Sequence, residues 1–472
     1  MKIIPTPEKA VYSSKLVSEK ERQYLIDTSL LKEEYAVKID DEGKVLISYS
    51  DEAGRFYAEQ TLKQIKNEKN LYPVCKIEDS PRFSYRGFML DCARHIIPID
   101  EIKKIIDAMA LLKFNRFHWH LTDDQGWRFE SEKFPVLNTV SAVREYSDFG
   151  KTYDGSPYGR VYTKAEMTEI VEYCKERFIE VIPEFDIPGH TSALLAAFPE
   201  LSCSGLKVKV KTHQGIFKDV ICPAKEDSLK TVCEIFDEIC EVFPSEYIHI
   251  GGDEAPSRHW ESCPDCQQLM KELGSENYKE YQNFFMNGVI EHLGKKGKTF
   301  IVWNDAAAGK NLSKDAIVQY WKENDKATFE FANGGGRLIL SPFTYYYTDY
   351  GYDITPLNRT YSFNTKIKGV NPNSIFGLEV PIWTEYIDNK STLEGLLFPR
   401  AIAVAENAWS KNKRSYAEFC DKVNSFTPFL EELGIETAPQ SEWTKSRAQM
   451  PIGWLRFVNK NYSLDYIKSA LK

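Results

Sequence analysis

Two adjacent acids, Asp253 and Glu254, are the side chains of this chain that are best placed to do chemistry. They follow the apolar run 247–250, which predicts a buried strand, and Gly251 and Gly252 allow a tight turn and a close approach of the backbone to a ligand. The Asp-Glu pair occurs four more times in the chain, in segments that we interpret as solvent-exposed. This pair differs because it lies at the carboxyl end of a strand, where parallel α/β enzymes carry their reactive groups.

The elements that would hold this pair have the pattern of a barrel. From Tyr85 onward, apolar runs of strand length alternate with helical patterns of about ten or more residues, which is typical of βαβ units. No glycine-rich phosphate-binding fingerprint follows the first strand, so an open doubly wound sheet is disfavoured. We expect a closed (β/α)8 TIM barrel. Its predicted strands are residues 87–91, 116–121, 180–186, 247–250, 299–303, 316–320, 337–340 and 375–379.

The chain of 472 residues is long enough for more than one domain. Residues 1–82 combine short strands with an amphipathic stretch at 53–65 and predict a small N-terminal α/β domain. The catalytic barrel is expected over residues 83–410, with 400–409 as its eighth helix. Residues 411–472 predict a C-terminal helical extension packed on the barrel.

Side chains that could bind or transform a substrate follow every predicted strand. Each of them alone is more simply a core aromatic or a capping acid, but a barrel brings all of its strand ends to one face. Tryptophans and a tyrosine around carboxylates and one arginine are typical of a pocket for a neutral, polyhydroxylated ring. In strand order these residues are Asp91 and Arg94; His120, Asp123, Asp124 and Trp127; Asp186 and His190; Asp253 and Glu254; Trp303 and Asp305; Trp321; Tyr347 and Asp349; Trp383 and Glu385.

These segments resemble the β-N-acetylhexosaminidases of glycoside hydrolase family 20. The similarity runs from the N-terminal domain to about Trp409 and is carried by residues 91–95, 118–128, 183–190, 249–254 and 383–385. It implies an exo-acting, retaining hydrolase that removes terminal β-linked N-acetylhexosamine (GlcNAc, GalNAc or both) from a glycan or oligosaccharide. It also implies substrate-assisted catalysis, in which the acetamido oxygen attacks the anomeric carbon and an oxazolinium intermediate forms.

The resemblance also implies a role for each site residue. Glu254 is the general acid and base, Asp253 orients the acetamido N–H, and Tyr347 binds the acetamido carbonyl. We expect the surrounding tryptophans to raise the pKa of Glu254, so that it stays protonated for attack on the leaving group. The other residues implied to bind the substrate are Arg94, Asp349 and Glu385 at the ring hydroxyls, Trp303, Trp321 and Trp383 as aromatic walls, and Asp123 with His190 as a relay toward the acid.

Two details depart from the family pattern. Asn304 separates Trp303 from Asp305, where an acid is expected directly after the tryptophan. In the strand-eight segment 377–381, Pro381 stands where a small or apolar residue is more usual. Apart from these departures, alternating residues at 206–211 in the loop after the third strand predict a hairpin that could shape the outer subsites. The sequence leaves open which N-acetylhexosamine is bound, the linkage and aglycone preference, and the oligomeric state.

Two other functions are compatible with the residues alone. A metal-dependent barrel hydrolase would use His118 and His120, which lie on one face of a strand. The last histidine, His292, precedes the fifth strand, so the later strand ends offer no imidazole, and we expect no cofactor and no catalytic metal. A catalytically silent sugar-binding protein would share the aromatic pocket, although it would not need both Asp253 and Glu254.

Composition narrows the partners and the compartment. The net charge of -9 disfavours nucleic acid and anionic membranes as partners. No run reaches the roughly 18 apolar residues of a membrane span, and the first residues lack a signal-peptide pattern. We therefore expect a cytoplasmic protein as the chain stands, or a secreted or periplasmic one if a leader has been removed.

The ten cysteines are scattered along the chain and form no dense disulfide framework. This distribution suits free thiols in a reducing compartment. Cys263 and Cys266 form the one close pair, which provides half of a zinc site, and no second pair has a matching spacing. Whether these two cysteines bind a metal stays open.

Overall fold

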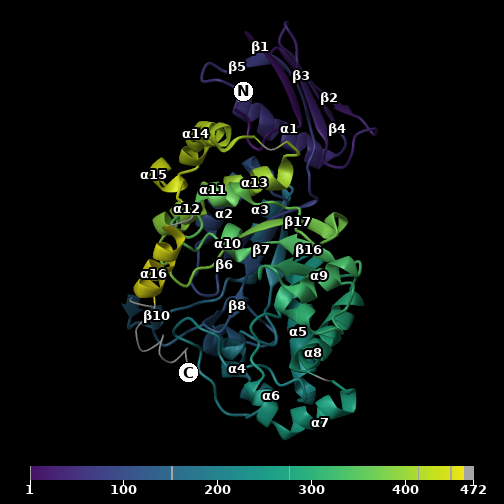
Figure 1. The fold of residues 1–472 in the computed structure, drawn as a ribbon, viewed down its shortest axis with the longest axis vertical. Coiled ribbons are helices and arrows are strands. Elements are labelled where there is room, and N and C mark those ends of the chain that lie inside the picture. Colours follow the sequence, from purple (N-terminus) through teal and green to yellow (C-terminus); the bar gives the residue numbers. More distant parts are fainter. Residues whose placement is uncertain (1, 150–151, 276, 413, 447–448, 462–472) are drawn as a thin grey trace.

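The computed structural model describes residues 2–149, 152–275, 277–412, 414–446 and 449–461. Its two main parts are a sheet near the N-terminus and a larger barrel below it (Figure 1). The C-terminal helices run along one side of the barrel (Figure 1). In the described ranges, no helix is both long and apolar enough to cross a membrane.

The N-terminal part is a five-stranded sheet covered by one helix. Its strands are β1 (Lys9–Ser18), β2 (Glu21–Ile26), β3 (Tyr35–Ile39), β4 (Lys44–Tyr49) and β5 (Leu71–Asp79). They lie in the order β1-β5-β3-β4-β2, and the pairings are antiparallel except that of β2 with β4. Helix α1 (Glu52–Ile65) begins after Asp51, whose side chain accepts a hydrogen bond from the Gly54 N–H, and it buries Tyr57 and Leu62 in the core of this part. This helix is the amphipathic stretch that the sequence predicts.

Eight parallel strands close into the barrel, in the order in which they occur along the chain. They are β6 (Tyr85–Asp91), β7 (Arg116–His120), β12 (Glu180–Glu184), β13 (Tyr247–His249), β14 (Thr299–Trp303), β15 (Ile317–Tyr320), β16 (Arg337–Leu340) and β17 (Ile375–Ile382). Pairing of β17 with β6, from Gly377 opposite Tyr85 to Ile382 opposite Leu90, closes the ring. All eight predicted strands are present, so the prediction of a (β/α)8 TIM barrel is confirmed.

The interior of the barrel changes from apolar to charged along its axis. Near the amino ends of the strands, an apolar cluster contains Tyr85, Ile182, Tyr247, Ile301, Ile317 and Ile339. Closer to the carboxyl ends, the buried side chains are His118, Glu184, His249, Gln319 and Glu379. Because alternate residues of a strand share a face, these polar residues lie directly beneath the carboxyl-end opening. The barrel therefore supports its upper end with a hydrogen-bonded layer and not with an apolar one.

The crossover helices are long in the first half of the barrel and short in the second. The long ones are α2 (Ile99–Leu111), α3 (Lys164–Lys175), α5 (Glu226–Val242) and α8 (Tyr278–Gly294). After β14 comes a five-residue 3-10 helix, Asn304–Ala308, and later crossovers hold α9 (Lys326–Asn333), α10 (Phe343–Tyr346) and α11 (Leu357–Ser362). The expectation of about ten helical residues after every strand is therefore wrong for these crossovers. Trp321 and Tyr347, which line the cavity at the strand ends, belong to the non-helical parts of these crossovers. The eighth helix, α13 (Arg400–Trp409), has the predicted bounds.

The predicted hairpin at 206–211 is wrong. Residues 203–220 form no strand, although Val208 and Val210 are buried and the lysines beside them are exposed. Val210 packs against Ala193 and Ala196 of helix α4 (Ser192–Ala197), so the alternation reflects an extended segment on a helix. Alternating burial alone does not require a paired strand.

In the part of the C-terminal region that the structure describes, the chain forms three helices after α13. They are α14 (Tyr416–Glu432), α15 (Gln440–Trp443) and α16 (Met450–Asn461). Phe419 of α14 stacks on Tyr361 with ring centroids 4.1 Å apart, and Trp454 of α16 lies 5.0 Å from the ring of Tyr350. The part of the predicted extension from 462 to 472 lies outside the described residues.

Buried ion pairs join the N-terminal sheet to the barrel. The Arg86 guanidinium lies 2.8 Å from Glu33, and the Lys113 ammonium lies 2.9 Å from Asp79. Asp79 also accepts a hydrogen bond of 2.9 Å from the indole of Trp409. Because Lys113 and Asp79 are both fully buried, neither charge can exchange its partner for water.

We expect Lys113→Met to lower the free energy of unfolding by about 3 kcal/mol, because it leaves the buried Asp79 carboxylate without its cation. Urea denaturation measures this change. Lys9→Met is the matched control, since Lys9 pairs with Glu78 on the surface and its loss should cost less than about 1 kcal/mol. Equal effects of the two substitutions would contradict this account of the junction.

Candidate active site

A cavity of about 310 Å³ lies at the carboxyl ends of the barrel strands. It brings together ten of the eleven residues to which the family resemblance assigns a role. Its lining residues are Arg94, Asp123, Asp186, His190, Gln214, Gly215, Ile216, Asp253, Glu254, Trp321, Tyr347, Asp349, Tyr350, Trp383, Glu385, Tyr386 and Phe457. Trp303 is the one of those eleven residues that does not line this cavity.

The turn after β13 places the two adjacent acids at the floor of the cavity. Gly251 and Gly252 have φ values of 67° and 102°, in the left-handed region that favours glycine. A Cβ on Gly251 would lie 1.7 Å from Asp186 Oδ1, and the Gly252 N–H donates a 3.0 Å hydrogen bond to the same oxygen. Glu254 itself has a φ of 43°, which is a strained value for a residue with a side chain. The tight turn predicted from the two glycines is confirmed, and the group that the backbone approaches closely here is the Asp186 carboxyl.

His190 connects the acidic pair to a second set of carboxylates. Its Nδ1 lies 3.2 Å from Asp123 and 3.1 Å from Asp124, while its Nε2 lies 3.7 Å from Glu254 and 3.9 Å from Asp253. Burial alone would lower the pKa of His190, but the surrounding carboxylates, Asp123 above all, raise it well above its ordinary value. The ring is therefore a cation that faces both members of the pair.

This cation reverses the predicted electrostatics of Glu254. Burial raises the pKa of Glu254, as expected, but hydrogen bonding and the positive charge of His190 outweigh burial and leave the pKa below its ordinary value. Asp253 behaves in the opposite way, because burial raises its pKa to about 6. The prediction that the pocket raises the pKa of Glu254 is wrong for the free protein, in which the pair holds its proton mainly on Asp253.

The far end of the cavity carries the polar groups predicted to hold ring hydroxyls. Arg94 lies 2.7 Å from Asp123 and 3.8 Å from Glu385, and its guanidinium lies 4.9 Å from the centre of the Trp383 ring. Burial, followed by the charge of Glu385, raises the pKa of Asp349 to about 8. Asp349 Oδ1 is buried and has no hydrogen-bond partner among the described residues. A neutral carboxyl with an unused oxygen is suited to a hydroxyl group of a ligand.

Three aromatic side chains form the walls between the two ends. Trp321 stacks on Tyr347 at 6.2 Å, and Tyr347 lies 6.3 Å from Trp383. The indole N–H of Trp321 donates a 3.0 Å hydrogen bond to Asp305, which follows Asn304 in the segment that departs from the family pattern. Asp305 comes one residue later in the sequence than the family pattern expects, but it still contacts Trp321, an aromatic side chain of the cavity.

Trp303 lies beneath the cavity. It is almost fully buried, donates a 2.8 Å hydrogen bond to Glu184 and packs 5.7 Å from the ring of Trp383. The expectation that Trp303 is an aromatic wall is corrected by this burial, because its ring supports Trp383 from below.

No pattern in the sequence identified the buried network that contains Glu184. The Glu184 carboxylate contacts His118, His120 and His249, and His118 and His120 continue to Glu379 and Asp123 at 2.9 Å each. Burial would lower the pKa values of His118 and His120, but the nearby carboxylates raise them to about 9 and about 10. Both nitrogens of both rings are thus occupied by carboxylates, so these histidines offer no lone pair to a metal.

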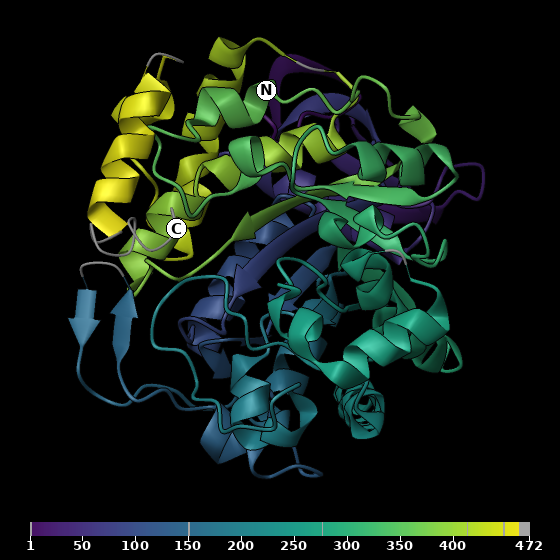
Figure 2. The ribbon, with the colours of Figure 1, turned by 60° about the horizontal axis from the view of Figure 1, so that its bottom comes forward.

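The cavity also contains residues that the strand-end pattern could not single out. Tyr350 and Tyr386 each follow a predicted site acid directly, so their proximity was a usable signal. Gln214 to Ile216 come from the middle of the loop that follows α4, and Phe457 comes from α16. In Figure 2 the yellow C-terminal helices lie across the molecule from the teal segments that follow β13. No local pattern links such distant segments to one pocket.

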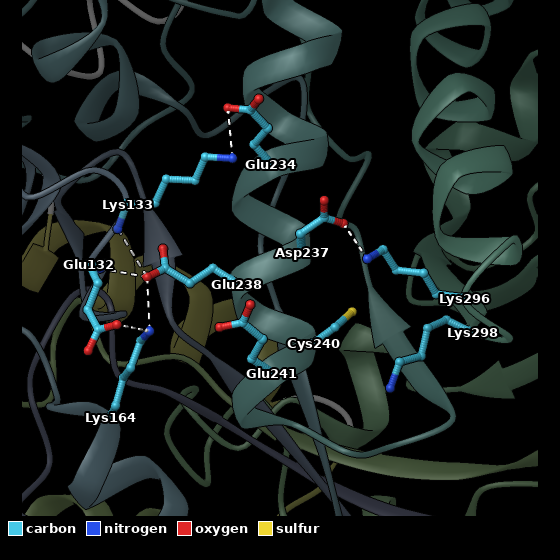
Figure 3. A pocket seen from close by; sticks show the side chains of 10 residues that line it. All are labelled: Glu132, Lys133, Lys164, Glu234, Asp237, Glu238, Cys240, Glu241, Lys296 and Lys298. Carbon is cyan, nitrogen blue, oxygen red and sulfur yellow. Dashed lines mark hydrogen bonds and ion pairs between the residues drawn. The ribbon is translucent and has the colours of Figure 1, made fainter.

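A second hollow, of about 690 Å³, lies beside α5 and is larger than the cavity at the strand ends (Figure 3). Three of its four lysines point toward acids of α5, with Lys133 3.2 Å from Glu234, Lys164 3.1 Å from Glu238 and Lys296 2.9 Å from Asp237. No aromatic side chain is among its lining residues. Paired surface charges without an aromatic wall do not suit a sugar ring, so the smaller cavity is the candidate active site.

An acidic pair beside aromatic side chains, at the carboxyl ends of parallel barrel strands, is the arrangement expected of a glycoside hydrolase. Residues 83–412 match the family described as glycosyl hydrolase family 20, catalytic domain. The chain therefore belongs to glycoside hydrolase family 20.

Named relatives and solved structures agree with this family. The chain is 36% identical over 438 residues to a beta-hexosaminidase of Porphyromonas gingivalis, covering 87% of this chain and 55% of that protein. It is 34% identical to a beta-hexosaminidase of Akkermansia muciniphila, covering 91% and 90%. The crystal structure of a beta-N-acetylhexosaminidase from Bacteroides fragilis superposes with a TM-score of 0.83 at 28% identity, covering 94% of this chain and 99% of that one.

We expect Gly251→Ala to lower kcat/KM at least about tenfold, because a Cβ there overlaps the Asp186 carboxyl and must displace the acidic pair. Gly395→Ala is the control, since a Cβ at that helix position meets nothing within 4 Å and alanine favours a helix. Activity with an aryl glycoside and thermal unfolding would be measured for both. An active, stable Gly251→Ala protein would show that the turn tolerates a side chain.

Proposed function

We propose that this chain is an exo-acting, retaining β-N-acetylhexosaminidase that releases terminal β-linked N-acetylhexosamine from a glycan or oligosaccharide. The observation that carries the proposal is the pair Asp253 and Glu254 on one strand end, facing a cavity that Arg94, Asp349 and Glu385 also line. Catalysis resides in residues 83–410, with residues 1–82 and 411–472 as flanking parts.

The pair favours a nucleophile that belongs to the substrate. A two-carboxylate glycosidase needs acids on opposite sides of the scissile bond, about 5 to 9.5 Å apart, whereas adjacent residues of one turn approach from one side. Burial and the charge of Asp253 raise the pKa of Asp186 well above its ordinary value, so that Asp186 is neutral and a poor nucleophile. The 2-acetamido oxygen of the substrate takes this role.

In the first step, Glu254 protonates the glycosidic oxygen while the acetamido oxygen attacks the anomeric carbon and the bond to the leaving group breaks. Asp253 accepts the acetamido N–H and balances the positive charge of the oxazolinium ring, and Tyr347 donates to the acetamido oxygen. In the second step, Glu254 takes a proton from water, which attacks the same carbon from the side the leaving group occupied. Two inversions give net retention.

Substrate binding has to move one proton within the pair. In the free protein Glu254 has a lowered pKa and Asp253 a raised one. An acetamido N–H favours ionised Asp253, and an aglycone that covers Glu254 favours its neutral form. Both effects shift the proton from Asp253 to Glu254. His190 Nε2 lies within 4 Å of both carboxylates and so connects Asp253 with Glu254.

The remaining site residues hold the sugar ring. Trp321, Tyr347 and Trp383 present aromatic faces to the ring, and Trp303 supports Trp383 from below. Arg94, Asp349 and Glu385 bind its hydroxyls. Asp123 fixes Arg94 and His190 at once, because its two oxygens contact these two residues at 2.7 and 3.2 Å.

We expect the 2-acetamido aryl glycoside to be hydrolysed with a kcat/KM at least about 10³-fold higher than that of the matched 2-hydroxy aryl glycoside, which has no group to attack the anomeric carbon. The comparison uses one leaving group and one protein preparation, with both GlcNAc and GalNAc compounds. Comparable kcat/KM values for the 2-acetamido and the 2-hydroxy glycosides would reject substrate assistance. Binding of these glycosides without any turnover would identify a catalytically silent sugar-binding protein.

The pH dependence of kcat/KM should have an alkaline limb with an apparent pKa of about 6. The reactive state carries one proton on the pair, and that proton is lost as the pH rises past the higher of the two pKa values. Asp253→Asn leaves Glu254 as the single acid, with a pKa that His190 lowers, so the limb should move to lower pH as kcat falls. An alkaline limb near pH 8, or one unmoved by Asp253→Asn, would contradict this assignment.

A further inference from the structure

Four cysteines from two separate loops meet beside the active site. Cys203 and Cys222 begin and end the long loop after α4, while Cys263 precedes helix α7 (Pro264–Leu273) and Cys266 lies in its first turn. All four sulfur atoms lie within 4.8 Å of one another. The Cys266 sulfur is 3.3 Å from that of Cys222 and 3.7 Å from that of Cys203. Cys203 and Cys222, from the loop after α4, therefore form the second pair of cysteines beside Cys263 and Cys266. Their spacing in the sequence does not reveal this pairing.

The sulfur separations fit one tetrahedral metal ion. Zinc–sulfur bonds of about 2.3 Å in a tetrahedron place the sulfur atoms about 3.8 Å apart. All four donors are cysteine sulfurs, and such a set selects zinc or another thiophilic metal over magnesium or calcium. Four protein ligands also fill a tetrahedral zinc, which leaves no open position for a substrate.

The surroundings of the cluster are those of a built site. Cys222, Cys263 and Cys266 are buried in an apolar cluster with Val220, Trp260 and Tyr281. The Trp260 indole donates a 2.9 Å hydrogen bond to the carbonyl of Ile221, which fixes the residue before Cys222.

We infer that Cys203, Cys222, Cys263 and Cys266 bind one structural Zn²⁺ that holds the loop at 203–222 against the segment that follows the catalytic acids. The tip of this loop, Gln214 to Ile216, lines the active-site cavity. The loop contains no strand, and its backbone is held at separate points such as the hydrogen bonds from Lys211 N–H to the Asp124 carbonyl and from Cys222 N–H to the Leu201 carbonyl, so four ligand bonds add a further anchor at its base. The ion takes no part in bond cleavage, and its binding does not depend on the proposed activity. The role of the loop in shaping the outer subsites rests on the proposed function.

Metal analysis of the full chain, purified without chelator, tests the site directly. We expect about one zinc per chain by inductively coupled plasma mass spectrometry, and its release by a mercurial thiol reagent. Cys222→Ser should reduce the zinc to below about 0.1 per chain, whereas Cys222→His should retain it, because histidine replaces cysteine in zinc sites. Cys420→Ser, at a cysteine outside the cluster, is the matched control and should keep its zinc.

Two further measurements separate the alternatives. Intact mass of the denatured, unreduced protein should show free thiols, and a mass about 4 Da lower, from two disulfides, would overturn the inference. So would iron in place of zinc, a metal-free protein with four free thiols, or zinc retained in Cys222→Ser. Zinc removal should lower the Tm. If the loop whose residues 214–216 line the cavity shapes the outer subsites, zinc removal should also raise KM for an oligosaccharide more than for an aryl glycoside. Equal KM changes for both substrates would overturn the role of the loop.

Discussion

The buried carboxylate of Glu184 is the interaction on which the reaction centre depends. It joins the histidines of β7 and β13 to the tryptophan at the end of β14, across three strand pairings of the barrel. A buried charge without partners costs several kcal/mol, so the register that satisfies Glu184 is strongly preferred. The same register sets the heights of Asp123 and Asp253 at the strand ends. The buried network around Glu184 and the side chains at the strand ends are therefore adjacent layers of one set of polar contacts.

That network also sets the charge on the catalytic pair. His190 is held cationic by Asp123 and Asp124, and its charge lowers the pKa of Glu254 while burial raises that of Asp253. When the free pair carries one proton, these shifts favour Asp253 over Glu254 as its position. Substrate binding changes the solvation of both groups, and this dependence gives a physical reason why proton transfer follows correct occupancy of the cavity.

The inner and outer parts of the cavity have different origins. The floor and the hydroxyl-binding end come from strand ends, whose geometry the barrel dictates. The outer rim comes from Gln214 to Ile216 in a loop without strands and from Phe457 in the C-terminal region. Rim segments of this kind tolerate change without disturbing the barrel, so recognition of what lies beyond the first sugar can vary while the chemistry stays the same.

The sequence by itself determined the barrel and ten of the eleven predicted site residues around the cavity, because strand period and strand-end chemistry are local properties. It could not determine the ionisation of Glu254, the burial of Trp303, or the meeting of Cys203 with Cys266. Each of these depends on distances between residues far apart in the chain. Coulombic interaction, desolvation and metal ligation all depend on those distances, and only the closed tertiary structure sets them.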